Sequence, residues 1–327
     1  DFTMKQTFTL GLSKLTKAAS LIALFASNAT LAESYQSFSS LSYQHNNYTF
    51  TSASENYLSQ GERDNTTLFS QYFFDERAAL GPLNEFSYIN TSSNVYASLN
   101  HSNSDHTSVN GLWNSDSNSS SNDIYLGGQW FFHDFIVGGS YGYSKRKLES
   151  FSIYDGENRD YSFDDDDKDI SIMLGYLFTD NFLISLGCNE GKRDDDNCGL
   201  GAKYNWQLEG SDYIGFEYHV AGGFDDHYLS SQYFFNLGEQ SYAKLGVEYN
   251  YFTHEYFDNE DYWRVNGSYY YNANMSISAY YGENDFYGVS ASYFFNNNYA
   301  IEAGYSSAKL DRIDESEGYF FSLSAQF

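Results

Sequence analysis

Stretches of about ten residues, in which apolar side chains alternate with polar or small ones, recur along the whole chain. The segment YAKLGVEYNY (242–251) puts Ala, Leu, Val and Tyr on one face and Lys244, Glu248 and Asn250 on the other. Segments 170–178 and 318–327 repeat the pattern. Because successive side chains of a strand point to opposite faces, each stretch predicts a β-strand with one apolar and one polar face. A soluble sandwich alternates in the same way, so the period alone leaves two architectures open.

The ends of these predicted strands separate the two architectures. At every second strand end an aromatic cluster precedes a short polar turn, as in QYFFD (71–75), QWFFHD (129–134), YLFTDN (176–181), QYFFN (232–236), YYYNAN (269–274) and YFFNNN (293–298). Exposed aromatic residues along one rim would be an aggregation liability on a soluble sandwich. On a membrane barrel they form the girdle at the lipid–water interface. The clusters therefore favour a closed antiparallel transmembrane β-barrel.

The pattern predicts sixteen strands, an even number, as bacterial single-chain barrels require. The predicted strands are 37–48, 65–74, 93–102, 123–132, 135–146, 168–178, 182–191, 198–207, 213–224, 227–236, 241–254, 259–271, 274–283, 286–295, 299–309 and 317–327. Connections at one end are short, and long loops are predicted at the other end over 49–64, 103–122 and 147–167. The link 75–92 is long but falls on the short-turn side, so it is either a turn or an extra hairpin.

Composition agrees with a chain made of strands and excludes some partners. The 327 residues hold 17 Lys and Arg against 44 Asp and Glu, a formal net charge of −27, which excludes nucleic acid as a partner because phosphate binding needs a basic face. The 33 Tyr residues and the single proline, Pro82, favour strands over helices. A disordered acidic chain would not carry this aromatic content.

The N-terminal residues have the pattern of a secretory signal peptide. From Met4 onward, three lysines precede the apolar run AASLIALFA, and small residues continue to Ala32. The apolar run is too short to cross a bilayer as a helix. We predict cleavage after Ala32, with Ala29 as the alternative, which leaves 33–327 as one barrel domain.

The two cysteines and the seven histidines are the residues best suited to form a disulfide, a metal site or a catalytic site. Cys188 and Cys198 flank NEGKRDDDN, fall on one face of a predicted hairpin and lie in an oxidising compartment, so they predict a disulfide. The seven histidines are scattered, and the predicted register brings together no set of Ser, His and an acid. No metal-ligand spacing is present, and DNEDYW and DGENRD lack the calcium-loop pattern. The sequence therefore predicts no enzyme, no metal and no cofactor.

Charged side chains on the polar strand faces mark the interior of the barrel. They are Lys203, Glu217, His219, Lys244, Glu248, Arg264 and Glu302. A charge facing lipid costs about 2–4 kcal/mol at the bilayer midplane, so these groups must face water or a partner. They either line a water-filled pore or pair across neighbouring strands and fill the wall.

The segment YFFDERAALGPLNEFSYINTSSNVYASL (72–99) resembles the general porins of marine γ-proteobacteria, in which an aromatic strand end precedes a Gly-Pro-Leu segment and a Ser/Asn-Val strand. The similarity extends over most of the chain and rests on the order of features, because no single motif is highly specific. It implies an outer-membrane pore for small hydrophilic solutes. The expected partners are outer-membrane lipid and lipopolysaccharide, and the sequence leaves both a monomer and a homotrimer open. The final strand, with Tyr319, Phe321, Leu323 and Phe327, resembles the signal that the barrel-assembly machinery reads.

In sixteen-stranded porins the loop after the fifth strand folds into the pore and narrows it. Here that connection carries Glu149, Asp155, Glu157, Asp160, Asp164, Asp165, Asp166 and Asp167. If it folds inward, these carboxylates form an acidic constriction that attracts cations. The alternative is a solvated outer loop whose charge binds divalent ions shared with lipopolysaccharide. The function predicted is a cation-preferring diffusion channel; an adhesin or receptor barrel acting through the Asn/Ser-rich segment 100–123 is the alternative.

Overall fold

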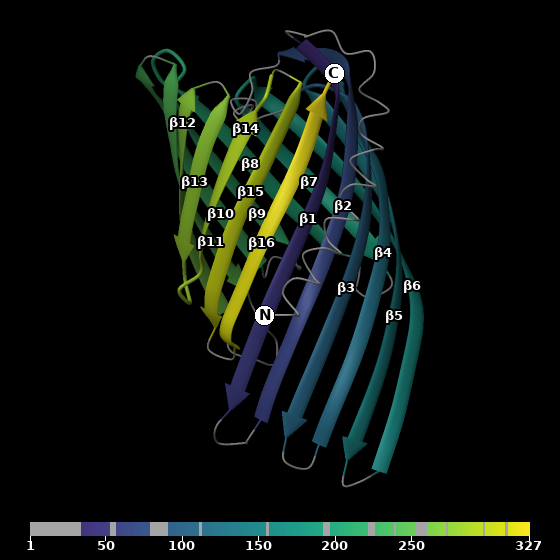
Figure 1. Cartoon of the computed structure of the whole chain (residues 1–327). Helices are drawn as coiled ribbons and strands as arrows, with labels where there is room; N and C mark the ends of the chain where they lie inside the picture. The colour runs from purple at the N-terminus through teal and green to yellow at the C-terminus, as the bar shows by residue number, and fades with distance from the viewer. Residues whose placement is uncertain are drawn as a thin grey trace.

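The computed structural model describes residues 34–327 except 53–56, 79–90, 111–112, 155–156, 192–196, 222–225, 239, 253–259, 273, 297 and 311–312. These residues form one closed antiparallel barrel of sixteen strands (Figure 1). The strands are β1 (Ser34–Ser52), β2 (Tyr57–Ala78), β3 (Asn94–Asn110), β4 (Trp113–Phe132), β5 (Phe135–Tyr154), β6 (Glu157–Thr179), β7 (Phe182–Gly191), β8 (Asn197–Gln207), β9 (Tyr213–Ala221), β10 (Asp226–Gly238), β11 (Ser241–Phe252), β12 (Glu260–Asn272), β13 (Met275–Gly282), β14 (Tyr287–Phe294), β15 (Tyr299–Leu310) and β16 (Ile313–Gln326).

Every strand pairs with its neighbours in sequence, and β1 closes the barrel against β16. Leu41 of β1 lies opposite Leu68 of β2 on one side and Leu323 of β16 on the other. The carbonyl of Phe327 accepts backbone hydrogen bonds from Gln36 and Ser37, at 2.6 and 2.7 Å. Among the described strands, closure therefore leaves no unpaired sheet edge, which is what a spanning sheet requires. The predicted strand number and closed antiparallel fold are confirmed.

The apolar face of each strand points outward. Ile172 and Leu174 of β6, for example, are 64% and 57% exposed, whereas Met173 between them faces the interior, which we call the lumen. The aromatic residues predicted at one rim are exposed there; they include Phe74, Phe132, Phe178, Tyr271 and Phe295. None of the described residues belongs to a helix with the length and apolarity of a membrane span.

A second group of outward tyrosines lies toward the opposite rim and was not predicted. Tyr305 donates a hydrogen bond to Glu317 at 2.8 Å, and Tyr281 donates one to Asp285 at 3.0 Å. Each ring is thus joined to a carboxylate by its hydroxyl group. This is the amphipathic arrangement expected of an aromatic side chain at a lipid–water interface.

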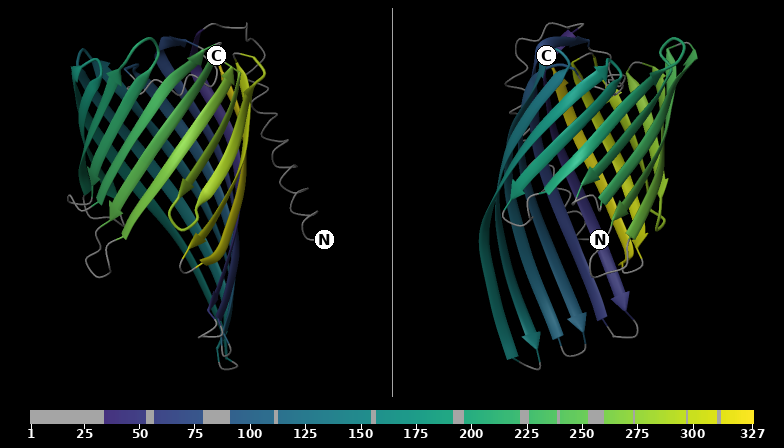
Figure 2. Two further views of the ribbon diagram at one scale, coloured as in Figure 1. Left: turned by 90° about the vertical axis from the view of Figure 1, so that its left-hand side faces the viewer. Right: turned by 180° about the vertical axis from the view of Figure 1, so that it is seen from behind.

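The long loops predicted at the end opposite the short turns are wrong. Strands β1 to β6 have 17 to 23 residues each, and their hairpins project beyond the rim formed by the other strands (Figures 1 and 2). The described parts of 49–64, 103–122 and 147–167 lie almost entirely in these strands. The short connections at 133–134 and 208–212 were predicted correctly.

These segments were assigned to loops because Asn, Ser and Asp have low intrinsic β-propensity and their pattern shows no apolar alternation. Hydrogen-bonded pairing with the neighbouring strand keeps these segments extended despite their low propensity. Strands β3 and β4, for example, keep a continuous register from Asn94↔Gln129 to Asn110↔Trp113. Side chains add cross-strand bonds, such as the one that Asn118 donates to Asp105. Because these parts of the strands project past the rim of the barrel, neither of their faces has to carry apolar side chains toward lipid.

Two other predictions fall partly or wholly on segments that the structure does not describe. Strand β2 continues to Ala78 and β3 begins at Asn94, and the two pair directly, but 79–90 lie outside the described residues. The predicted signal peptide, 1–32, also lies outside them.

Candidate channel lumen

The seven inward charged residues predicted from the sequence all belong to the lumen face of the strands. Lys203, Glu217, Ser230, Glu248 and Arg264 are successive cross-strand neighbours from β8 to β12. The outward positions beside them are large and apolar, as at Phe216, Val247 and Val265 (which are exposed). The strand period therefore sorts the charges into a single belt on one wall of the lumen.

Four of these charges pair directly across strands. Lys203 Nζ lies 2.8 Å from Glu217 Oε1, and Arg264 Nη2 lies 2.5 Å from Glu248 Oε2. His219 Nε2 contacts the same Glu217 oxygen at 2.7 Å. The side chains of Glu217 and Glu248 are only 19% and 18% exposed, so each carboxylate is held against the wall by its partner. The alternative of cross-strand pairing is thus correct for these residues, although they also face the lumen.

A polar hollow of about 520 Å³ opens on this belt. Its wall includes Glu217, Lys244, Glu248, Arg264 and Glu302, with Tyr228, Tyr280, Asn266 and several serines between them. Asn266 donates a hydrogen bond to the second oxygen of Glu248 at 3.2 Å. Small polar and charged groups around open space form a wall that water can wet.

The opposite wall carries a second polar row that the sequence reasoning missed. Thr67 donates to Asn100 at 2.9 Å, and Asn100 donates to Asp123 at 2.9 Å. Ser121 and Ser144 also donate to Asp123. The carboxylate of Asp123 is therefore held by three neutral donors. In the sequence, Asp123 is an acidic residue at an inward position of the predicted strand 123–132. The run of Ser and Asn residues before it hides this signal.

The acidic segment predicted as an inward-folding loop is a pair of strands. Glu149 lies in β5, and Glu157, Asp160 and Asp164–Asp167 lie in β6, while Asp155 lies outside the described residues. Asp164–Asp167 are directly opposite Lys147, Arg146, Lys145 and Ser144. A basic run on β5 thus aligns with the acidic run and holds it in the sheet. The segment does not fold into the pore as a loop.

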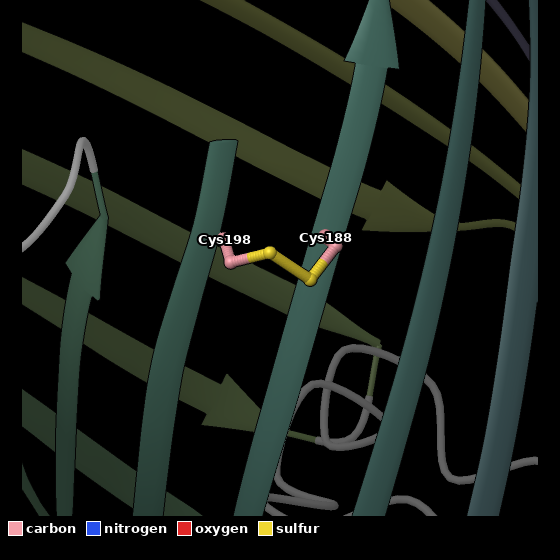
Figure 3. The surroundings of a disulfide bond; sticks show 2 residues. All are labelled: Cys188 and Cys198. Atoms are coloured by element: carbon pink, nitrogen blue, oxygen red, sulfur yellow. A yellow bond between two sulfur atoms is a disulfide. The ribbon is translucent and has the colours of Figure 1, made fainter. Parts of the chain in front are cut away.

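The predicted disulfide joins Cys188 of β7 to Cys198 of β8 (Figure 3). The two residues are direct cross-strand partners with Cα atoms 4.1 Å apart. They share the outward face with Leu186 and Leu200, which are exposed. The bond therefore ties the two strands together on the outer surface, near the end of their hairpin.

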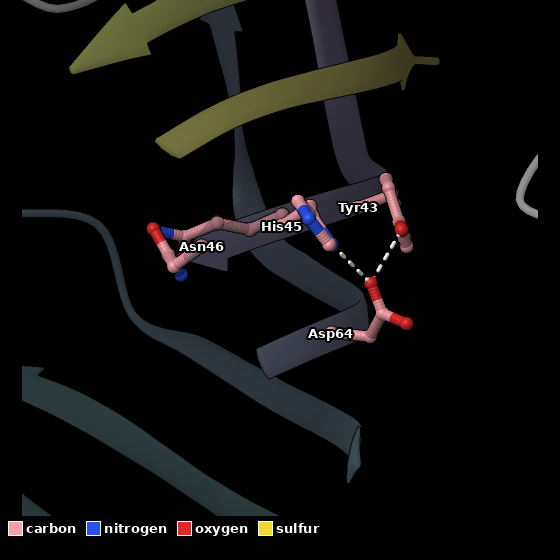
Figure 4. A network of polar contacts seen from close by, with 5 residues as sticks. Tyr43, His45, Asn46 and Asp64 are labelled. Atoms are coloured by element: carbon pink, nitrogen blue, oxygen red, sulfur yellow. Dashed lines mark hydrogen bonds and ion pairs between the residues drawn. The ribbon is translucent and has the colours of Figure 1, made fainter. Parts of the chain in front are cut away.

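A further polar cluster occupies the outward face of the seam that closes the barrel. Asp64 of β2 accepts a hydrogen bond from Tyr43 at 2.5 Å and contacts His45 Nδ1 at 2.9 Å (Figure 4). The His45 ring stacks on Tyr319 of β16, with centroids 4.9 Å apart. The cluster links three strands across the closure. In β16 the outward row also contains Phe321 and Leu323, and the role of this strand as an assembly signal stays a prediction.

Among the residues that the structure describes, no group of three or more His, Cys, Asp or Glu could hold a metal ion.

A closed barrel with an apolar exterior between aromatic belts and a polar lumen defines a transmembrane β-barrel channel of the outer-membrane type. The chain belongs to the family described as "Putative general bacterial porin", whose model matches residues 12–327. This membership supports a channel role in the bacterial outer membrane and confirms the resemblance seen in the sequence.

Solved structures with a similar fold are outer-membrane barrels. The toluene transporter TodX of Pseudomonas putida matches with a TM-score of 0.51 and 9% identity, over 89% of this chain and 90% of that chain. The outer membrane protein Omp33 of Acinetobacter baumannii matches with a TM-score of 0.46 and 15% identity, over 90% and 99%. At these identities the likeness concerns the fold alone. No curated protein matches the chain.

Proposed function

We propose that the chain forms a water-filled channel for passive diffusion of small hydrophilic solutes across the outer membrane. The observation that carries this proposal is the inward belt of charged residues beside a polar hollow of about 520 Å³. In lipid such charges would cost several kcal/mol, whereas facing water they are hydrated. A sixteen-stranded barrel is wide enough to hold an aqueous pathway.

The channel prefers cations modestly. In the belt from β8 to β12, Lys203 and Arg264 neutralise Glu217 and Glu248, so the pairs contribute little net charge. Asp123, by contrast, makes its direct hydrogen bonds with the neutral groups of Ser121, Ser144 and Asn100, while the positive charge of Arg146 acts on it without a direct ion pair. A fixed carboxylate in a pore wall attracts cations and repels anions.

Planar-bilayer recording of the purified protein tests both statements. We expect stepwise conductance increases and a reversal potential that favours cations in a salt gradient. Asp123→Asn should reduce the cation preference. Asp105→Asn is the matched control, because Asp105 also accepts a hydrogen bond from an asparagine but faces outward on a projecting hairpin. Equal shifts in the two variants would contradict the role of Asp123.

An adhesin or receptor barrel remains the second candidate, favoured by the hairpins that project past the rim (Figure 2). Their strands present Asn, Ser and Thr side chains over a large sheet, as in 100–123. A reconstituted barrel that is folded yet produces no conductance steps would overturn the channel and support this alternative.

A further inference from the structure

We propose that a set of glycines fixes the cross-section of the pore, because each holds a large inward aromatic side chain flat against the wall. The inference rests on the proposed channel function. The five pairs are Tyr48 with Gly61, Tyr96 with Gly127, Tyr125 with Gly142, Tyr280 with Gly288 and Phe320 with Gly304. In each pair the two residues are direct cross-strand partners on adjacent strands.

The ring of each aromatic residue occupies the place where a side chain on the glycine would begin. A Cβ atom added at any of the five glycines would come within 3.0 Å of the ring, closer than real Cβ atoms approach other atoms. At Gly288 both Cζ and the hydroxyl oxygen of Tyr280 are that close, so the phenol reaches across to the next strand. Neighbouring strands are about 4.8 Å apart, and a tyrosine that spans this gap runs along the wall.

The neighbours of Tyr280 restrict where its ring could go. The guanidinium of Arg264 lies 5.4 Å from the ring centroid on one side, and the Phe286 ring lies at 4.8 Å. Tyr280 itself lines the polar hollow. A side chain on Gly288 would therefore lift the ring from the wall, and the direction that remains open is the lumen.

Phe320 shows the same arrangement on the strand next to the closure. Its ring lies over Gly304 of β15. Two residues close to Gly304 line the hollow: Glu302 on the same strand and Ser290, the cross-strand partner of Gly304 on β14. Tyr280 lines the hollow, and Phe320 lies on β16, next to the strand that carries the lining residue Glu302, so both rings held flat keep this side of the lumen open. The glycines are thus determinants of the largest solute that passes.

The test uses Gly288→Val in the full-length protein, because the three atoms nearest to a Cβ at Gly288 all belong to Tyr280, whereas a Cβ at Gly304 would also meet the Val289 carbonyl oxygen at 2.9 Å. Because a ring lifted into the lumen narrows the water-filled path, we expect conductance to fall by roughly one third to one half. Swelling of liposomes in sugars of increasing size should show a lower exclusion limit. Gly267→Val is the matched control: the Gly267 backbone borders the same hollow, but its Cβ would point outward and meet Leu245 at 3.4 Å, an ordinary contact, so conductance should not change.

A second variant separates ring displacement from general damage. Tyr280→Ser in the Gly288→Val background removes the ring, and conductance should return to the wild-type value. If the valine variant does not fold, Gly288→Ala supplies the same Cβ in a smaller form. Folded Gly288 variants with wild-type conductance and exclusion limit would overturn the inference, as would a failure of Tyr280→Ser to restore conductance. A wild-type protein without conductance would instead count against the proposed function.

Discussion

Arg146 of β5 lies directly opposite Asp165 of β6 in the hairpin that projects beyond the barrel rim. On either side of this pair, Lys145 is opposite Asp166, and Lys147 is opposite Asp164. Lys145 Nζ also lies 3.7 Å from Asp164, diagonally across the strands. The most acidic run of the chain is therefore paired in register with its most basic run, and the alignment holds the two strands together outside the membrane.

Replacing Lys145, Arg146 and Lys147 with Gln should loosen this part of the hairpin. Each opposite-charge pair contributes about 0.2–1 kcal/mol, and the acids left behind would repel one another. Hydrogen exchange at 144–151 and 160–167 should become several-fold faster. Exchanging the three bases with Asp164–Asp166 should restore protection. Unchanged exchange in the Gln variant would show that backbone pairing alone maintains the hairpin.

Arginine substitutions at neighbouring positions on the two faces of β6 should destabilise the barrel to different extents. Ile172→Arg places a charge on the exposed outward face and should lower the free energy of unfolding by about 2–4 kcal/mol. Ser171→Arg faces the lumen beside Ser140, where water hydrates the charge, and should cost much less. Urea unfolding in lipid vesicles measures both values. A similar cost at the two positions would contradict the assigned faces.

The disulfide between Cys188 and Cys198 should stabilise the β7–β8 hairpin. For a sequence separation of 10 residues, the loss of unfolded-state entropy is worth about 2–3 kcal/mol. A reductant should lower the urea midpoint of the wild-type protein and leave that of a Cys188→Ala, Cys198→Ala double variant unchanged. Equal midpoints for oxidised wild-type protein and the double variant would argue against a stabilising role.

Glu248 and Arg264 should be energetically coupled. Glu248→Gln leaves a half-buried guanidinium without its carboxylate, and Arg264→Gln leaves the carboxylate without its cation. Each change should cost about 1–3 kcal/mol, while the double variant should cost less than the sum. Glu248→Gln should also shift the reversal potential toward anions. Additive costs in the double-mutant cycle would mean that the pair contributes no coupling energy.

The sequence alone determined the barrel, its strand number and the faces of most strands. Period-two alternation ending on aromatic clusters, as at YFFNNN (293–298), is a local property, because it follows from the pleat of a single strand and the position of the lipid interface. The inward position of residues such as Glu217 and Arg264 follows from the same alternation. The disulfide could also be predicted from the sequence, because both cysteines fall on one face of a single predicted hairpin and the compartment is oxidising.

Only the tertiary structure decided how far the first six strands extend and what the inward groups contact. Asp164–Asp167 carry no strand signal of their own, and they are ordered by a basic run about twenty residues earlier, whose alignment depends on the register of β5 against β6. The glycines under Tyr280 and Phe320 likewise acquire a role only from their cross-strand partners. Register is a relation between strands, and a single strand's pattern fixes which face a residue occupies but not which residue it meets.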